Sequence, residues 1–209
     1  GLTAPGAQHH PLEVSASLGL KIALGTLMAA ILNGASNGIN QVYDLAIDRV
    51  NKPRRPIPSG RLSIREANLV TLVLYVVAMA MALAVNRQCF ALAAAAAVLT
   101  VVYSAPPLRT KRFGVLANFT IAVPRGVLLK VAGWSAVRPI LGDREPWFIG
   151  LVFGTFLLGA STTKDFADMK GDAADGCITL PIRYGPRRAA WLIAPFFVLP
   201  FLLIPLGTW

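Results

Sequence analysis

The sequence has 209 residues, of which 55% are hydrophobic and 14% are charged, and its formal net charge is +10. A soluble domain carries about 25% charged residues, so much of the surface is expected to face a solvent less polar than water. The basic charge alone would suggest nucleic-acid binding. Here, however, Lys and Arg stand in short segments between long apolar runs, so we expect no nucleic-acid partner.

Six apolar runs approach the roughly 20 residues that a helix needs to cross a bilayer. In chain order they are residues 17–40, 67–86, 88–105, 115–136, 146–164 and 189–209. Because the runs are continuous and do not alternate with polar residues, they predict helices and not the strands of a barrel. The expected fold class is an all-α, polytopic transmembrane helical bundle that lies in the lipid bilayer.

No linker or second domain is visible, so residues 1–209 are expected to form a single domain. The chain begins with Gly1 and ends at Trp209 inside an apolar run. We therefore expect that both ends are incomplete.

Basic residues are distributed unevenly between the two sides of these runs. The loops after the first, third and fifth runs hold fourteen Lys and Arg residues, whereas the loops on the opposite side hold three. The positive-inside rule then places the three basic loops in the cytoplasm of an integral membrane protein. The same loops carry nearly all the acidic residues, which the topology rule does not require.

The first of these loops opens with Asn40, Asp44 and Asp48, spaced four residues apart. At this spacing the side chains lie on nearly one face of a helix. Their oxygen atoms suit Mg²⁺, which is often bound through one or two carboxylates together with substrate phosphates. A solvated helix end, with each Asp paired to a nearby Arg, explains a single motif of this kind about as well.

The third basic loop carries a second acidic group, Asp165, Asp168 and Asp172, which again shares one helical face. Two acidic groups on one membrane face can hold two metal ions, and a diphosphate could then be gripped from several sides. Acidic residues next to a span are energetically costly and point to function. We therefore favour a metal-dependent phosphate site over two ordinary helix ends.

Basic side chains near the acidic groups could contact phosphate oxygens. Lys52 and Arg55 belong to a stiff, Pro-rich loop, and Lys111 and Arg112 belong to a purely cationic one. Topology alone explains any single one of these residues about as well, and it is the role expected of the neighbouring Arg109.

A further basic residue, Arg125, stands inside the fourth apolar run, where an isolated charge is costly. It could face a central cavity and hold an anionic acceptor molecule. It could equally reach the interface by snorkelling, or pair with another helix.

The motif N-x-x-x-D-x-x-x-D, followed by N-K-P-x-R-P-I-P-S-G, resembles the signature of the UbiA superfamily of intramembrane prenyltransferases. The second acidic group, continuing to T-L-P at 179–181, resembles the second Asp-rich motif of that family. S-A-P-P-L at 104–108 is similar to members related to chlorophyll synthase, and R-G-V-L-L at 125–129 to homogentisate prenyltransferases. The likeness extends over residues 33–185. Family members usually have about nine helices, so six spans imply a fragment or a shortened member.

The resemblance implies transfer of an isoprenyl group from an isoprenyl diphosphate to an aromatic or lipid acceptor, as in lipid or quinone biosynthesis. Mg²⁺ would assist ionisation of the diphosphate. The implied catalytic residues are Asp44, Asp48, Asp168, Asp172 and Lys111. The implied Mg²⁺ ligands are Asn40, Asp44, Asp48, Asp168 and Asp172. The implied substrate-binding residues are Asn40, Lys52, Arg55, Tyr103, Arg112, Asp165 and Arg125.

Two other functions stay open as alternatives. CDP-alcohol phosphotransferases also bind Mg²⁺ through intramembrane Asp residues, but the order of their motif, D-G-x-x-A-R followed by G-x-x-x-D-x-x-x-D, is not found here. A cation transporter would place its acidic residues in mid-span along a pathway. In this sequence the acidic residues stand at the ends of the predicted spans.

Overall fold

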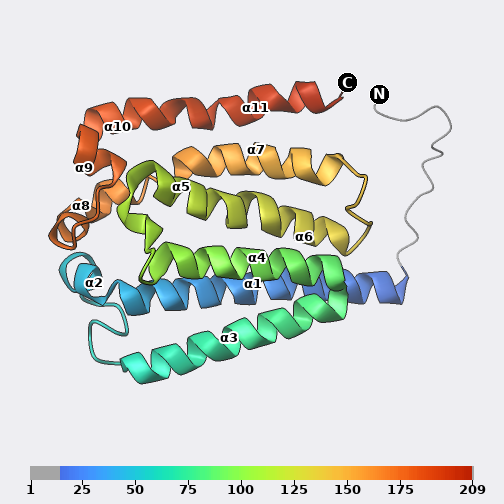
Figure 1. Cartoon of the computed structure of the whole chain (residues 1–209), viewed down its shortest axis with the longest axis horizontal. Coiled ribbons are helices and arrows are strands. Elements are labelled where there is room, and N and C mark those ends of the chain that lie inside the picture. The colour runs from blue at the N-terminus through green and yellow to red at the C-terminus, as the bar shows by residue number, and fades with distance from the viewer. Residues whose placement is uncertain (1–14, 209) are drawn as a thin grey trace.

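The computed structural model describes residues 15–208, and this part of the chain is almost entirely helical. Within these residues no strand forms, and one isolated bridge joins Phe113 to Ile178. The predicted all-α fold class is therefore confirmed. The helices run side by side along the length of the molecule (Figure 1).

The first half of the described chain forms three long helices and one short one. Their bounds are α1 (Ala16–Tyr43), α2 (Leu45–Asn51), α3 (Ile64–Val85) and α4 (Arg87–Ser104). The long helices begin after Ser15, Ser63 and Asn86, whose side chains each accept a hydrogen bond from an N–H of the first turn. Such caps satisfy donors that have no partner inside the helix. The first three predicted spans are therefore confirmed as helices.

The fourth predicted span is one continuous rod made of three segments, preceded by a short 3-10 turn. The bounds are η1 (Thr110–Arg112), α5 (Gly114–Ala122), the π-helical segment η2 (Val123–Leu128) and α6 (Leu129–Ser135). Pro124 lies at the start of the π-helical segment, and its ring removes one N–H donor from the helical hydrogen-bond pattern. The rod as a whole runs over Gly114–Ser135, close to the predicted span at 115–136.

A helix of 16 residues, α7 (Glu145–Ala160), packs against this rod. The polar helix α8 (Asp165–Ala174) follows after a short turn and is bent by 61° from α7. The predicted fifth span, 146–164, is thus cut short at its C-terminal end. The physical reason is that a helix with three buried Asp residues does not continue into an apolar layer.

The chain ends in a string of short helical segments. Their bounds are α9 (Leu180–Tyr184), α10 (Pro186–Ile193), η3 (Ala194–Phe197), α11 (Leu199–Leu203) and η4 (Ile204–Thr208). Pro195, Pro200 and Pro205 stand near the starts of the last three segments, where each removes an N–H donor and breaks regular α-helix. Residues Pro186–Gly207 are nonetheless long and apolar enough to cross a membrane. The predicted span at 189–209 is therefore confirmed, apart from Trp209, which lies outside the described residues.

In all, the described residues contain five helices long and apolar enough to span a membrane, or six if the bent pair α7–α8 counts as one span. This agrees with the predicted number. Large apolar side chains point outward, among them Leu69, Val76 and Leu83 of α3, each more than half exposed. Such a surface suits contact with lipid tails.

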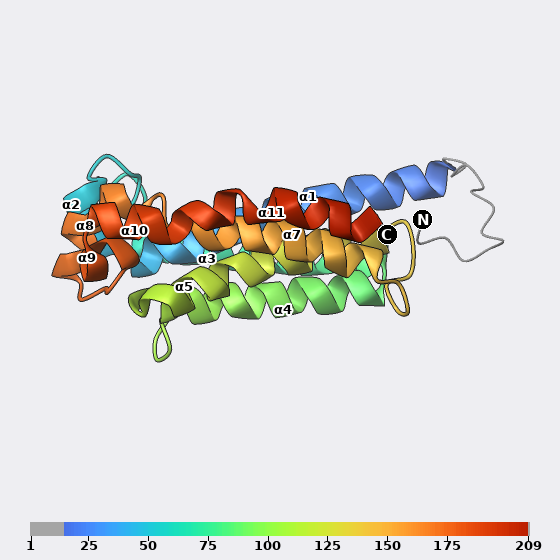
Figure 2. The same ribbon diagram turned by 90° about the horizontal axis from the view of Figure 1, so that it is seen from above.

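The polar segments collect at one end of the bundle. Figures 1 and 2 show α2, α8 and α9 together at the end opposite the α6–α7 connection. Between the ends, the core holds small side chains, including Ala78 and Ala82 of α3 and Ala93 and Ala96 of α4. Small residues let helices approach closely in lipid. The bundle therefore acts as a rigid support for a site at its polar end.

Candidate active site

A cavity of about 170 Å³ lies where the polar segments meet the bundle. It is lined from α1, α2, α4, η1, the α5–η2 rod and α8, so both halves of the chain contribute. Ten of the twelve predicted site residues line it, and they are Asn40, Asp44, Asp48, Lys52, Arg55, Tyr103, Lys111, Arg125, Asp168 and Asp172. Asp165 and Arg112 do not.

The first acidic motif crosses the junction of α1 and α2. Asp44 ends α1 and begins α2 with φ −96° and ψ 13°, a small departure from helical geometry. Asn40, Asp44 and Asp48 therefore keep one face, as their spacing predicts, and all three line the cavity. The Asn40 amide donates to Asp44 Oδ2 at 2.9 Å. Asp48 is only 2% exposed.

The second acidic motif lies on α8, where Asp165, Asp168 and Asp172 are all buried. Asp168 and Asp172 face the main cavity, whereas Asp165 lines a smaller neighbouring cavity together with Asp172. No salt bridge joins Asp172 to a cation of the described chain. Burial raises the pKa of Asp172 to about 6, although the charges of Lys111 and Lys164 act in the opposite direction.

Most carboxylates of the cavity are paired with cations from other segments. Lys111 Nζ lies 2.5 Å from Asp44 Oδ1, and Lys52 Nζ lies 2.5 Å from Asp168 Oδ2. Arg55 donates to both carboxylate oxygens of Asp48, at 2.9 and 2.7 Å. The two acidic motifs and the cationic loop thus form one charged network around the cavity.

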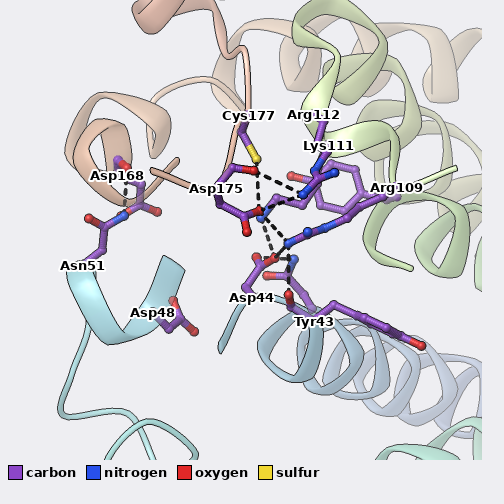
Figure 3. Close-up of polar contacts among 12 residues, drawn as sticks. Tyr43, Asp44, Asp48, Asn51, Arg109, Lys111, Arg112, Asp168, Asp175 and Cys177 are labelled. Carbon is purple, nitrogen blue, oxygen red and sulfur yellow. Dashed lines mark hydrogen bonds and ion pairs between the residues drawn. The ribbon is translucent and has the colours of Figure 1, made fainter. Parts of the chain in front are cut away.

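Arg109 belongs to this network, in addition to the mainly topological role that the sequence suggested for it. Its Nη2 lies 2.9 Å from Asp175 and 3.4 Å from Asp44, and it also donates to the Tyr43 carbonyl at 3.0 Å. The side chain is only 12% exposed. The backbone of Arg109 is left-handed, with φ 37°. Arg109 thus ties the end of α1 to the loop after α8 (Figure 3).

Arg112 lies outside the main cavity. It donates to the Asp175 carbonyl at 3.2 Å, and its side chain remains 43% exposed. Its predicted contact with substrate stays a prediction. Asp175, which holds both Arg109 and Arg112, was not among the predicted site residues. Its only sequence signal is its position three residues after Asp172.

The inner wall of the cavity carries further polar side chains. Arg125, from the π-helical segment η2, donates to Ser36 Oγ at 3.3 Å and to Asn37 Oδ1 at 3.1 Å. No salt bridge joins Arg125 to a carboxylate within residues 15–208. Tyr103 is buried, and its hydroxyl accepts a hydrogen bond from Lys164 at 3.4 Å. Lys164 also lines the cavity and forms an ion pair with Asp165 at 2.9 Å. It was not among the predicted site residues.

The donor set suits Mg²⁺ that arrives with a phosphate ligand. Within residues 15–208, no three His, Cys, Asp or Glu side chains converge into a preformed metal cage. The cavity instead presents carboxylates in two pairs, Asp44 with Asp48 and Asp168 with Asp172. Mg²⁺ is usually bound in this way, through one or two carboxylates and the oxygens of a substrate.

These features define a polytopic membrane protein with a cavity of acidic and basic residues at one end. The UbiA prenyltransferase family matches the chain over residues 4–209, and the chain belongs to this family. It is therefore an integral membrane protein. The family match favours a prenyltransferase over both alternatives that the sequence left open, a CDP-alcohol phosphotransferase and a cation transporter.

Relatives with three different names match the chain about equally well. The bacteriochlorophyll synthase 34 kDa chain of Chloroflexus aurantiacus is 34% identical over 83% of this chain and 56% of its own length. The digeranylgeranylglyceryl phosphate synthase of Methanopyrus kandleri is 34% identical over 98% of this chain and 73% of its own length. The chloroplastic homogentisate solanesyltransferase of Arabidopsis thaliana is 38% identical over 84% of this chain and 47% of its own length. The chain thus spans about half to three quarters of these relatives.

Solved structures agree with the fold. A UbiA homologue from Archaeoglobus fulgidus bound to GPP and Mg²⁺ has a TM-score of 0.74 and 27% identity, and the match covers 88% of this chain and 64% of that one. A digeranylgeranylglyceryl phosphate synthase structure has a TM-score of 0.68 and 27% identity, and the match covers 94% of this chain and 66% of that one. The predicted UbiA-like bundle is confirmed.

Proposed function

We propose that this protein transfers an isoprenyl group from an isoprenyl diphosphate to an aromatic or lipid acceptor, with Mg²⁺ as cofactor. The observation that carries this proposal is the single cavity that joins Asp44 and Asp48 of the first motif to Asp168 and Asp172 of the second. The related structure bound to GPP and Mg²⁺ supports the same substrate class.

Asn40, Asp44 and Asp48 are proposed to hold one Mg²⁺, and Asp168 and Asp172 a second, with Asp165 assisting from the neighbouring cavity. When bound, Mg²⁺ neutralises charge on the diphosphate and so promotes its departure from the allylic carbon. Asp172 is the carboxylate best prepared to receive a cation, because no Lys or Arg of the described chain forms a salt bridge with it.

Lys111, Lys52 and Arg55 are proposed to turn from their carboxylates toward phosphate oxygens when the diphosphate enters. Each now lies against a carboxylate that the metal would take over. Because negative charge grows on the leaving oxygen as the C–O bond breaks, a fixed cation there stabilises the transition state more than the ground state. Arg112 is proposed to reach the diphosphate from outside the cavity.

Arg125 is proposed to hold an anionic group of the acceptor. It reaches the cavity from inside the bundle, away from the acidic motifs, and its present partners are the neutral side chains of Ser36 and Asn37. Tyr103, which is buried and lines the cavity, is proposed to contact the substrate and to help exclude water, which would otherwise capture the allylic cation.

The test is prenyl transfer by the purified protein with a panel of isoprenyl diphosphates, a panel of acceptors and Mg²⁺, with products read by mass spectrometry. We expect product with the wild type, and a loss of turnover by orders of magnitude in Asp44→Ala and Asp172→Ala. Lys111→Ala should lower kcat/KM by about 100- to 1000-fold, the range for removal of one preorganised electrostatic contact.

Asp143→Ala is the matched control, because Asp143 is bonded to Trp134 and Glu145 near the opposite end of the bundle. It should retain wild-type turnover. Near-normal turnover in Asp44→Ala or Asp172→Ala would remove the two-motif model. Absence of any prenylated product from the wild type would remove the proposed function.

A further inference from the structure

One neutral side chain joins the two acidic helices. Asn51, the last residue of α2, donates from its amide nitrogen to the Asp168 carbonyl at 2.8 Å. Its amide oxygen accepts a hydrogen bond from the Gly171 N–H at 3.0 Å. An Asn carboxamide can donate and accept at the same time, so this one group grips the backbone of α8 at two points. Figure 3 shows Asn51 reaching across to Asp168.

The helices α2 and α8 also approach each other closely at Gly171. A Cβ added at Gly171 would lie 2.5 Å from Asn51 Nδ2 and 2.8 Å from the Ile47 carbonyl. Gly171 is buried, and real Cβ atoms do not approach other atoms this closely. Glycine at this position therefore lets α2 and α8 come together until the Asn51 carboxamide meets the α8 backbone.

The contact between Asn51 and α8 lies close to both acidic motifs. Asp48 lies three residues before Asn51 on α2, and Asp168 and Asp172 lie on the segment of α8 that Asn51 grips. Residues 51 and 168 are 117 positions apart in the chain. The relative position of the two acidic motifs thus depends on contacts between α2 and α8, and not on local helix geometry.

Among residues 15–208, the other direct polar link between these helices is the Lys52–Asp168 ion pair. That pair uses the carboxylate and the ammonium that a metal and a diphosphate would recruit, so it cannot hold the helices once both are engaged. Asn51 instead contacts only main-chain atoms of α8. Its bonds use no carboxylate and therefore do not depend on the charges of the cavity.

We propose that Asn51 is a positioning residue that sets the spacing between Asp48 on α2 and Asp168 and Asp172 on α8. It does not touch the substrate. This inference rests on the proposed function, since it assigns the spacing to a metal and diphosphate site. Loss of the carboxamide should let α8 move away from α2 and weaken divalent-cation binding.

The test uses the purified protein of residues 1–209 carrying Asn51→Ala or Asn51→Asp. Asn51→Asp keeps the size and the acceptor for Gly171 but loses the donor to the Asp168 carbonyl, and it covers the case in which Asn51→Ala fails to fold. Asn86→Ala is the matched control. Asn86 also donates to a main-chain carbonyl, that of Ser135 at 2.7 Å, and accepts from the Cys89 N–H at 2.7 Å. It lies between α3 and α4, at the end of the bundle opposite α2 and α8 (Figure 1).

Two readouts need no turnover: amide hydrogen exchange over residues 165–174 without metal, and Mn²⁺ affinity measured by electron paramagnetic resonance. Both Asn51 variants should exchange faster in this segment and bind Mn²⁺ about 10- to 100-fold more weakly, as when partners that orient metal ligands are lost. Asn86→Ala should leave Mn²⁺ affinity and the exchange of residues 165–174 unchanged, even if it lowers the melting temperature.

Unchanged exchange and unchanged Mn²⁺ affinity in both Asn51 variants would overturn the positioning role, even in an active enzyme. Equal losses of Mn²⁺ affinity in Asn86→Ala would also overturn it, since general destabilisation would then be the cause. A wild type that binds Mn²⁺ but forms no prenylated product would overturn the proposed function, while weaker Mn²⁺ binding in the Asn51 variants would still support the positioning role.

Discussion

At the residue scale, Asp44 and Asp172 both line the cavity but differ in the charged side chains that surround them. Asp44 is shared between Lys111 at 2.5 Å and Arg109 at 3.4 Å. Asp172 is buried with no such partner, and burial raises its pKa to about 6. A buried carboxylate without such a partner favours the protonated form until a cation arrives.

This difference predicts a pH dependence for the metal-free protein. The folded pKa of Asp172 is raised above its ordinary value of 3.8, so its contribution to stability is full below about pH 4 and is lost as the pH rises through about 6. Asn does not titrate. In EDTA, the melting temperature of the wild type should therefore fall relative to that of Asp172→Asn between pH 5 and pH 7.

Thermal unfolding in detergent, followed by intrinsic fluorescence, provides the measurement. Addition of Mg²⁺ with an isoprenyl diphosphate at pH 7 should raise the melting temperature of the wild type more than that of Asp172→Asn. A constant difference in melting temperature from pH 5 to pH 7 would show that Asp172 does not titrate in this range.

At the scale of elements, the packing of the π-helical segment against α7 fixes the inner wall of the cavity. A Cβ added at Gly126 of η2 would lie 2.5 Å from the Cα of Gly154 on α7, so the two backbones nearly touch. Arg125 precedes Gly126 directly and faces the cavity. The position of the guanidinium is therefore set by a contact between two glycines.

Gly126→Ala should push the rod away from α7 and shift Arg125. We expect a loss of roughly 1–3 kcal/mol in the free energy of unfolding, which is typical of overpacking, together with a higher KM for the acceptor. Gly133→Ala, in the same rod, is the control, because a Cβ there meets nothing within 4 Å. Denaturant unfolding and steady-state kinetics on both variants provide the test, and equal effects at the two positions would contradict the close-contact argument.

For the whole molecule, the charged network and its loops lie at one end of an apolar bundle. The loop between α2 and α3 lies at this end, whereas the α6–α7 connection lies at the other (Figure 1). The cavity end carries most of the basic residues, which the positive-inside rule assigns to the cytoplasm. We therefore propose that residues 41–66, 103–114 and 164–188 face the cytoplasm.

Single cysteines at exposed positions of the two ends test this orientation. Ser59 lies in the α2–α3 loop and Arg138 in the α6–α7 connection, and both are exposed. In a background without Cys89 and Cys177, Arg138→Cys should react with a membrane-impermeant maleimide in sealed cells, whereas Ser59→Cys should react only after permeabilisation. Labelling of Ser59→Cys from outside would reverse the proposed orientation.

The sequence by itself determined those features that depend on neighbouring residues. Long apolar runs predicted the helices, because a backbone in lipid must satisfy its hydrogen bonds internally. The four-residue spacing of Asn40, Asp44 and Asp48 predicted their common face, because helical geometry alone sets it. Together with the second acidic motif, these patterns were enough to indicate the family.

Only the tertiary structure decided how those segments meet. Arg109 and Arg112 are both arginines of the same cationic loop, yet the Arg109 side chain is 12% exposed between Asp44 and Asp175, whereas that of Arg112 is 43% exposed. Asn51 opens the N-K-P-x-R-P-I-P-S-G motif, but the motif did not indicate what Asn51 contacts, because its partners on α8 are main-chain atoms more than a hundred residues away. Such contacts depend on the packing of helices remote in sequence, and no local pattern of spacing or polarity records which side chains will face one another there.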